Sequence, residues 1–201
     1  MTATWTAPRT WIHGELVSAA MGNEQWRDNM DYLISVLRLA TLNLSVGNAI
    51  APMTLTPAAI EQIESSAGAP KANQFEARFD AAADEHLQWQ FVLPTSFSGT
   101  MILNLYYFMA SATSGNVVWA AMVSAKGDGD SGMTARVFDD PNTATSAVPG
   151  TAGNFKVVQI TLTNDDGMAG GDNVILDIYR DADNGSDTAT GDAVLTDVRP
   201  E

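Results

Sequence analysis

Three aspartates near the end of the chain have a spacing that suits cation binding. Asp181, Asp183 and Asp187 occupy odd positions of one run, as carboxylate ligands of calcium often do. The glycine of this run stands at its fifth position rather than its sixth, and no Glu follows that could bind through two oxygens, so the run is not an EF-hand loop. Asp, Asn and Gly also dominate ordinary turns. Calcium binding and plain turn formation are both open, and no other cofactor is indicated.

The residues needed for covalent catalysis are scarce. The chain has no Cys, which excludes disulfides, Cys-ligated zinc and thiol chemistry. Its two histidines are His13, in the N-terminal segment, and His86, at the head of a predicted strand. We expect surface or hydrogen-bonded structural roles for both, because geometry rather than presence makes a catalytic triad. No glycine motif that cradles phosphate occurs either. The sequence therefore predicts a protein that is not an enzyme.

The N-terminal segment carries large apolar residues but has no core of its own. Ser18 is a good N-cap for a helix that we expect to run to about Leu39. Such a helix would be loosely amphipathic, and a lone helix cannot bury its own apolar stripe, so we expect another protein to cover it. The residues that we expect to dock on this partner are Trp5, Trp11, Gly14, Leu16, Trp26, Arg27, Met30, Leu33 and Leu37.

Residues 4–38 also resemble a known kind of sequence. The positions that carry the resemblance are Trp11, Gly14, Glu15, Ala19, Ala20, Asn23, Arg27, Asp28, Asn29 and Leu33. In order and spacing they are similar to the N-terminal segment of tailed-bacteriophage appendage proteins, such as tail fibres, tail-tip proteins and head fibres. The run 171–183 looks like the last two strands of jelly-roll domains in phage virion proteins. The resemblance implies location in a virion, other virion proteins as partners and a homotrimer.

Charge divides the chain into unlike halves. The net charge is −14, and residues 74–201 hold 18 acidic against 6 basic residues. Such a surface repels nucleic acid and anionic membranes, so neither is an expected partner. No apolar run is long enough to span a membrane. Residues 1–73 are nearly balanced, with 6 acidic and 4 basic residues, as suits a segment buried against another protein.

The hydrophobic pattern indicates three regions. Residues 1–51 form the anchor, including an apolar tail over 42–47, and residues 52–73 a connector with a short helix from Ala58 to Ser65. From residue 74 the apolar period becomes two, which is typical of strands. The strands that we expect are 74–79, 86–93, 101–110, 117–124, 134–138, 155–163, 173–180 and 193–199.

Eight strands without intervening helices predict a mainly β fold, an antiparallel eight-stranded jelly-roll sandwich with an N-terminal helical anchor arm. An immunoglobulin-like sandwich is the alternative. Trp89, Phe91 and Trp119 fit core or inter-subunit packing better than a platform for sugars. For Arg180 we expect an ion pair within the chain or, in a trimer, a place near the symmetry axis.

Two functions follow from these features. The first is a structural component of a tailed-phage virion, which docks by its N-terminal segment and projects an acidic, trimeric jelly roll as a fibre, decoration or tail-tip protein. The alternative is a carbohydrate-binding module that recognises glycans of the host surface. That alternative predicts an exposed pair of aromatic side chains flanked by Asn, Asp or Gln.

Overall fold

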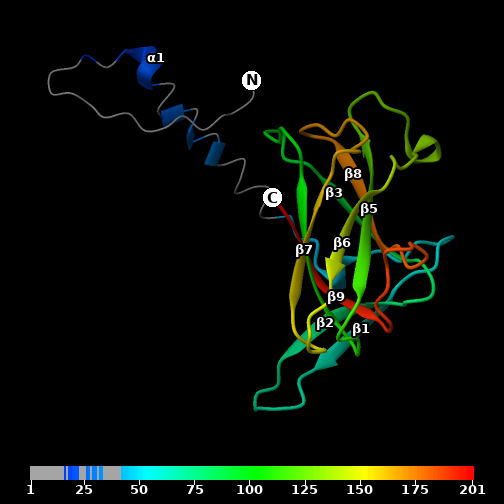
Figure 1. Cartoon of the computed structure of the whole chain (residues 1–201). Coiled ribbons are helices and arrows are strands. Elements are labelled where there is room, and N and C mark those ends of the chain that lie inside the picture. Colours follow the sequence, from blue (N-terminus) through cyan, green and yellow to red (C-terminus); the bar gives the residue numbers. More distant parts are fainter. Residues whose placement is uncertain (1–15, 17, 23–25, 28, 31, 34–41) are drawn as a thin grey trace.

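The computed structural model of the chain describes residues 16, 18–22, 26–27, 29–30, 32–33 and 42–201 (Figure 1). Four of the expected docking residues, Trp5, Trp11, Gly14 and Leu37, lie outside these residues, as does His13. Within the described part, no helix is both long enough and apolar enough to cross a membrane.

Nine strands and three short helical turns make up the described fold. The strands are β1 (Ala59–Glu64), β2 (Asn73–Phe79), β3 (Glu85–Val92), β4 (Ile102–Met109), β5 (Asn116–Lys126), β6 (Asn142–Ala147), β7 (Lys156–Thr161), β8 (Asn173–Arg180) and β9 (Ala193–Pro200). The helical turns are α1 (Ala19–Gly22), η2 (Val46–Asn48) and η3 (Met133–Ala135). All strand pairs are antiparallel, and the strands form two sheets.

The strand order is that of a jelly roll. One sheet has the order β1-β2-β9-β4-β7 and the other the order β3-β8-β5-β6. Four pairs, β2–β9, β3–β8, β4–β7 and β5–β6, are nested in sequence like the arms of one long hairpin. Rolling such a hairpin sends successive strands of each arm to opposite sheets, which is the jelly-roll topology. The predicted fold is confirmed, and β1 adds a ninth strand beside β2.

Alternating apolar residues build the core between the sheets. On β3 the side chains of Leu87 and Trp89 point inward, and on β4 those of Leu103, Leu105 and Tyr107 do so. Each fully buried large apolar side chain stabilises the fold by roughly 1.5–3 kcal/mol. Trp89 and Trp119 are fully buried, and Phe91 is partly buried and packs against the core, so the predicted core role of these aromatics is confirmed.

The predicted helix from Ala58 to Ser65 is wrong, because these residues form β1. Six consecutive residues pair with β2, from Ala59 opposite Arg78 to Glu64 opposite Asn73. Just before them, the His86 N–H donates to the Thr56 carbonyl and the Ala58 N–H donates to the His86 carbonyl. Ala, Glu and Gln are good helix formers, but helix propensity is a small term, and the pairing with β2 outweighs it.

One strand was expected in the wrong place. Residues 134–138 form no strand, and a single 3-10 turn, η3, begins there at Met133. The strand lies further on, as β6, and its inward residues are the small Asn142, Ala144 and Ser146. A strand of small polar residues at a sheet edge lacks the apolar alternation on which the prediction depended.

Residues 44–50 belong to the sandwich rather than to the anchor. Leu44 and Val46 lie in the core, and the Trp89 indole N–H donates to the Ser45 carbonyl at 3.0 Å. Ile50 exchanges both backbone hydrogen bonds with Gln88. A Cβ on Gly47 would lie 2.8 Å from the Phe75 ring, so only glycine fits this turn without a shift. The predicted apolar tail of the anchor is thus corrected from Leu44 onward.

The predicted helix start at Ser18 is confirmed. The Met21 N–H donates to the Ser18 side-chain oxygen at 3.2 Å, and the Gly22 N–H donates to the Ser18 carbonyl at 3.0 Å. The first bond satisfies an amide of the first turn that otherwise has no partner within the helix, and the second is the first regular backbone bond of the helix. Described residues 29, 30, 32 and 33 are also helical.

Candidate functional site

The outer face of the five-stranded sheet carries a row of aromatic residues, of which Phe155 is exposed and Tyr106 and Phe108 are half-buried. On β4, Leu105 and Tyr107 point into the core, so the intervening Tyr106 and Phe108 point outward. The ring of Phe108 meets that of Phe155, just before β7, edge to face at a centroid distance of 5.6 Å. Phe155 is 61% exposed. This pair, with one exposed and one half-buried ring, meets in part the exposed aromatic pair that the carbohydrate-binding alternative predicts.

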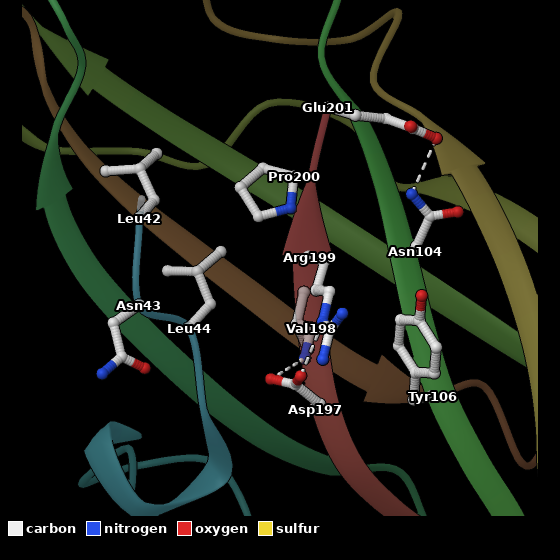
Figure 2. Close-up of a pocket in the computed structure, with 10 residues that line it drawn as sticks. All are labelled: Leu42, Asn43, Leu44, Asn104, Tyr106, Asp197, Val198, Arg199, Pro200 and Glu201. Atoms are coloured by element: carbon white, nitrogen blue, oxygen red, sulfur yellow. Dashed lines mark hydrogen bonds and ion pairs between the residues drawn. The ribbon is translucent and has the colours of Figure 1, made fainter. Parts of the chain in front are cut away.

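Polar side chains continue the row on the same face. The Asn104 amide donates to the Glu201 carboxylate at 2.7 Å, and the Gln159 amide donates to both Asn104 and Glu201 at 2.9 and 3.2 Å. Gln159 and Asn104 are direct cross-strand partners, which explains their contact. Figure 2 shows the Asn104 amide and the Glu201 carboxylate on the same strand face as the Tyr106 ring.

Arg199 and Asp197 on β9 complete this face. The Arg199 guanidinium carbon lies 4.9 Å from the Tyr106 ring centroid, a cation–π arrangement. Its Nε donates to an Asp197 oxygen at 2.9 Å, and this hydrogen bond, together with the carboxylate charge, raises the pKa of Arg199 above its usual value. We call the eight residues the aromatic face: Asn104, Tyr106, Phe108, Phe155, Gln159, Asp197, Arg199 and Glu201.

A pocket of about 520 Å³ opens at one end of the aromatic face. The segment 42–44 forms one wall, and β9 with Asn104 and Tyr106 of β4 forms the other (Figure 2). The space exists because β2 pairs with β9 only over residues 193–195 of β9, which leaves the rest of that side of β9 without a neighbouring strand. Its volume is in the range of about 300–1,000 Å³ that is common for small-molecule sites.

The side of β9 that has no neighbouring strand, beyond residue 195, is poorly suited to pair with a further strand. The Val198 N–H donates to the Asp197 side chain at 3.1 Å, and Pro200 has no N–H. A strand that offers few amide donors is a poor template for strand addition. Side chains rather than backbone groups therefore determine what this pocket can bind.

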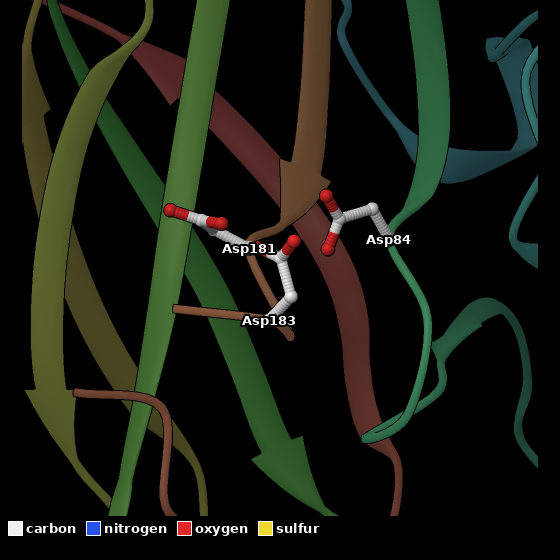
Figure 3. A group of neighbouring side chains, drawn as sticks. All are labelled: Asp84, Asp181 and Asp183. Carbon is white, nitrogen blue, oxygen red and sulfur yellow. The ribbon is translucent and has the colours of Figure 1, made fainter. Parts of the chain in front are cut away.

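The predicted calcium ligands separate in the structure. Asp181 and Asp183 stay together and are joined by Asp84, with one oxygen of each within 4.8 Å of the others (Figure 3). Asp187 instead binds Arg180, so its predicted place in this group is wrong. Asp84 precedes β3 and is almost a hundred residues away in sequence, and no local spacing could have indicated it.

These three carboxylates affect a neighbouring tyrosine. Burial, and next the charges of Asp181 and Asp84, raise the pKa of Tyr179 to about 12. Asp84 and Asp181 also have protein partners, since Asp84 accepts the Ala182 N–H and Asp181 accepts the Asn184 amide. Calcium takes six to eight oxygen ligands, and the three side chains supply part of such a set.

Arg180 and His86 have structural roles. Arg180 is fully buried and binds Asp187 through two hydrogen bonds of 2.7 and 3.0 Å. The predicted ion pair within the chain is confirmed, and a place at a trimer axis is excluded by this burial. The His86 ring lies 2.8 Å from an Asp177 oxygen and stacks on Tyr179 with a centroid distance of 4.6 Å. The expected hydrogen-bonded role of His86 is confirmed.

The expected docking residues that the structure describes lie at the surface. Leu16 is 91% and Trp26 70% exposed, and Met30 and Leu33 are also exposed. Arg27 is exposed as well. Surface exposure does not test whether these residues dock on another protein, so their docking role stays a prediction.

Comparisons with known proteins give likenesses of fold alone. No family model matches the sequence, and no curated protein matches it. Among solved structures, the carbohydrate-binding module TmCBM61 with β-1,4-galactotriose has a TM-score of 0.36 at 11% identity, over 80% of this chain and 99% of that one. A CBM28 module specific for non-crystalline cellulose has a TM-score of 0.41 at 14% identity, over 76% and 94%.

A phage protein is also among the similar structures. The enzymatically active domain of tailspike protein 4 from bacteriophage CBA120 has a TM-score of 0.42 at 10% identity, over 81% of this chain but 21% of that one. All three TM-scores lie below 0.5, so none of these likenesses carries an argument about what this chain binds.

Proposed function

We propose that the chain is a carbohydrate-binding module that holds a short oligosaccharide on the aromatic face. The observation that carries this proposal is the row of Tyr106, Phe108 and Phe155 beside the amides of Asn104 and Gln159. Sugar rings have an apolar face of C–H groups and a rim of hydroxyls, so aromatic side chains and planar hydrogen-bonding groups match the two parts.

The shape of the face favours a chain of sugars over a single ring. From Asn104 to Phe108 the outward positions of β4 extend over about 13 Å, at roughly 3.3 Å for each residue. The pocket lies at one end of this row and the Phe108–Phe155 pair at the other. Asp197, Arg199 and Glu201 would select among hydroxyl arrangements, because a hydroxyl both donates and accepts.

A glycan array followed by isothermal titration tests this function. We expect binding of at least one oligosaccharide, and we expect Phe155→Ala and Tyr106→Ala each to weaken it at least tenfold, or about 1.4 kcal/mol. Phe75→Ala is the matched control, because Phe75 is an exposed aromatic outside the aromatic face. No binding on the array, or equal losses in all three variants, would contradict the proposal.

We also propose a second function, in which the N-terminal segment docks the module on another protein. The exposure of Leu16, Trp26, Met30 and Leu33 favours it, and the resemblance of residues 4–38 to phage appendage proteins makes a virion the proposed location. Three such segments in a trimer would reinforce one another through their effective concentration. Trp26→Ala should reduce incorporation into particles and leave the unfolding of the β-sandwich unchanged. Equal incorporation of both forms in a complementation assay would refute it.

A further inference from the structure

A second pocket lies on the other sheet, away from the aromatic face. Its volume is about 370 Å³, and it lies between the outer side of the four-stranded sheet and the loop that follows β5. Gln90 of β3, Lys126 of β5 and Asn173 of β8 form its base, and the loop contributes Asp130 and Arg136 among others. This volume is also common for small-molecule sites.

Arg136 has unused hydrogen-bonding capacity in this pocket. Its Nη1 donates to the Asn173 side-chain oxygen at 2.8 Å, and its Nη2 donates to the Asn173 carbonyl. Asn173 thereby occupies the end of the guanidinium formed by the two Nη atoms. The Nε atom is buried and finds no acceptor among the described residues. The side of the guanidinium formed by Nε and Nη2 is thus half unsatisfied, which costs free energy.

The charge of Arg136 is also without a counterion. Arg78, Arg180 and Arg199 each form an ion pair with a carboxylate, whereas no described carboxylate lies within 4.0 Å of the Arg136 guanidinium. Lys126 is neutralised by Asp166 at 3.2 Å.

One carboxylate, that of Asp130, also lines the pocket, and its oxygen accepts the Gly127 N–H at 2.8 Å. Neither the Arg136 guanidinium nor the Asp130 carboxylate forms an ion pair among the described residues, so the two unpaired charges of this pocket have opposite signs.

We propose that this pocket binds a carboxylate group through the Nε and Nη2 atoms of Arg136, after a local side-chain shift that uncovers Nε, which is buried in the unbound chain. A carboxylate has two oxygens at the spacing of these two donors and accepts from both at once. The two donors on one side of the guanidinium, rather than an excess of positive charge, favour a carboxylate, and the net charge of −14 disfavours dianions such as phosphate. An acidic sugar and a small organic acid share this chemistry.

Titration calorimetry with matched probes tests the proposal. Sodium D-galacturonate and N-acetylglycine present a carboxylate on a sugar and on a small acid, and D-galactose and N-acetylglycinamide are their neutral counterparts. We expect at least one carboxylate to bind and its neutral counterpart to bind at least tenfold more weakly. The probe that binds identifies the source of the carboxylate. No binding of either carboxylate, or equal binding of the neutral forms, would overturn the proposal.

Substitutions connect the binding to Arg136. Arg136→Gln should weaken carboxylate binding at least tenfold, and Arg136→Lys should lose most of it, because an ammonium keeps the charge but lacks the two parallel donors. Lys156→Gln is the control, since it removes one positive charge from β7, on the other sheet. Unchanged affinity in Arg136→Gln, or an equal loss in Lys156→Gln, counts against the assignment.

A measurement on the unmodified chain guards against loss of folding in these variants. In NMR spectra the Arg136 Nε–H signal should shift when the carboxylate probe is added, and an unmoved signal would refute the assignment. Phe155→Ala should bind the carboxylate as the parent does, so failure of this proposal and failure of the glycan-binding function are distinguishable.

Discussion

Two clusters of the same residue types have opposite surroundings in this molecule. At one end of the core, Arg180 binds Asp187 beside Trp119, its cross-strand partner on β5. On the aromatic face, Arg199 binds Asp197 beside Tyr106. The Arg180 side chain is fully buried, whereas that of Arg199 is 66% exposed. An arginine, an aspartate and an aromatic ring are therefore compatible with either a structural or a binding role.

Saturation of the donors separates the two roles. Besides Asp187, Arg180 donates to the carbonyls of Ala189, at 2.6 Å, and Gly191, at 2.8 Å. A buried charge must be satisfied in this way, because water cannot reach it. Arg199 has one carboxylate and one ring face as partners, and solvent reaches the rest of its guanidinium. An exposed and unsaturated cluster can exchange water for a ligand at little cost, and a buried, saturated one cannot.

The largest expected effect is that of removing the buried cation. Arg180→Gln leaves the buried Asp187 carboxylate without its counter-charge, although the Val118 N–H still donates to it, and leaves the carbonyls of Ala189 and Gly191 without the guanidinium donors. We therefore expect the free energy of unfolding to fall by about 3–5 kcal/mol. Chemical denaturation with urea measures this loss, with Arg199→Gln as the matched control. An Arg180 variant as stable as the control would mean that the buried cluster does not hold the fold together.

The next largest expected effect is a loss of stability at alkaline pH that depends on Tyr179 and not on Tyr106. The pKa of Tyr179 is raised to about 12, so the folded state holds its proton where the unfolded chain, at about 10, loses it. Its contribution to stability is complete below pH 10 and is lost as the pH rises toward 12. Urea denaturation between pH 9 and pH 12 should show a smaller alkaline loss for Tyr179→Phe than for the parent.

Tyr106→Phe is the control in that series, because Tyr106 lies on the aromatic face rather than beside the three carboxylates. An alkaline loss that is equal in the parent and in both variants would show that Tyr179 is not held neutral by its surroundings.

The smallest expected effect on stability is that of Arg199→Gln. Exposed ion pairs contribute little to folding, because solvent screens them. We expect the midpoint of thermal unfolding to stay unchanged while affinity for the oligosaccharide falls severalfold, since a donor beside Tyr106 is lost. A drop in unfolding midpoint together with unchanged affinity would reverse the roles that we assign to the two clusters.

The fold could be predicted wherever side chains alternate in size and polarity. Residues 86–93 and 173–180 alternate plainly, and both became strands of the jelly roll within a residue of their predicted bounds. β6 could not be found, because its inward residues are small and polar. β1 looked helical, because its composition says nothing of the partner strand that pairs with it.

The residue types of a sugar-binding site could be predicted from the sequence, but the positions that supply them could not. The requirement for an aromatic pair beside amides came from the chemistry of sugars. Phe108 on β4 and Phe155 just before β7 supply the pair, and Tyr106 lies between Phe108 and Asn104 along β4. Arg136 gave no signal in the sequence, because its importance depends on the absence of a nearby carboxylate among the described residues. Asp84 could not be predicted either, because it lies almost a hundred residues before Asp181 and Asp183 in the sequence.

Asp197 has a consequence for self-association. One of its oxygens holds Arg199 on the aromatic face, and the other covers the Val198 amide on the open side of β9. Replacing this residue to retune ligand choice would also uncover an amide that a second molecule could pair with, a known route to fibrils. A substitution of Asp197 that changes ligand choice would therefore also lower solubility. A substitution of Gln159 would leave the Val198 N–H covered.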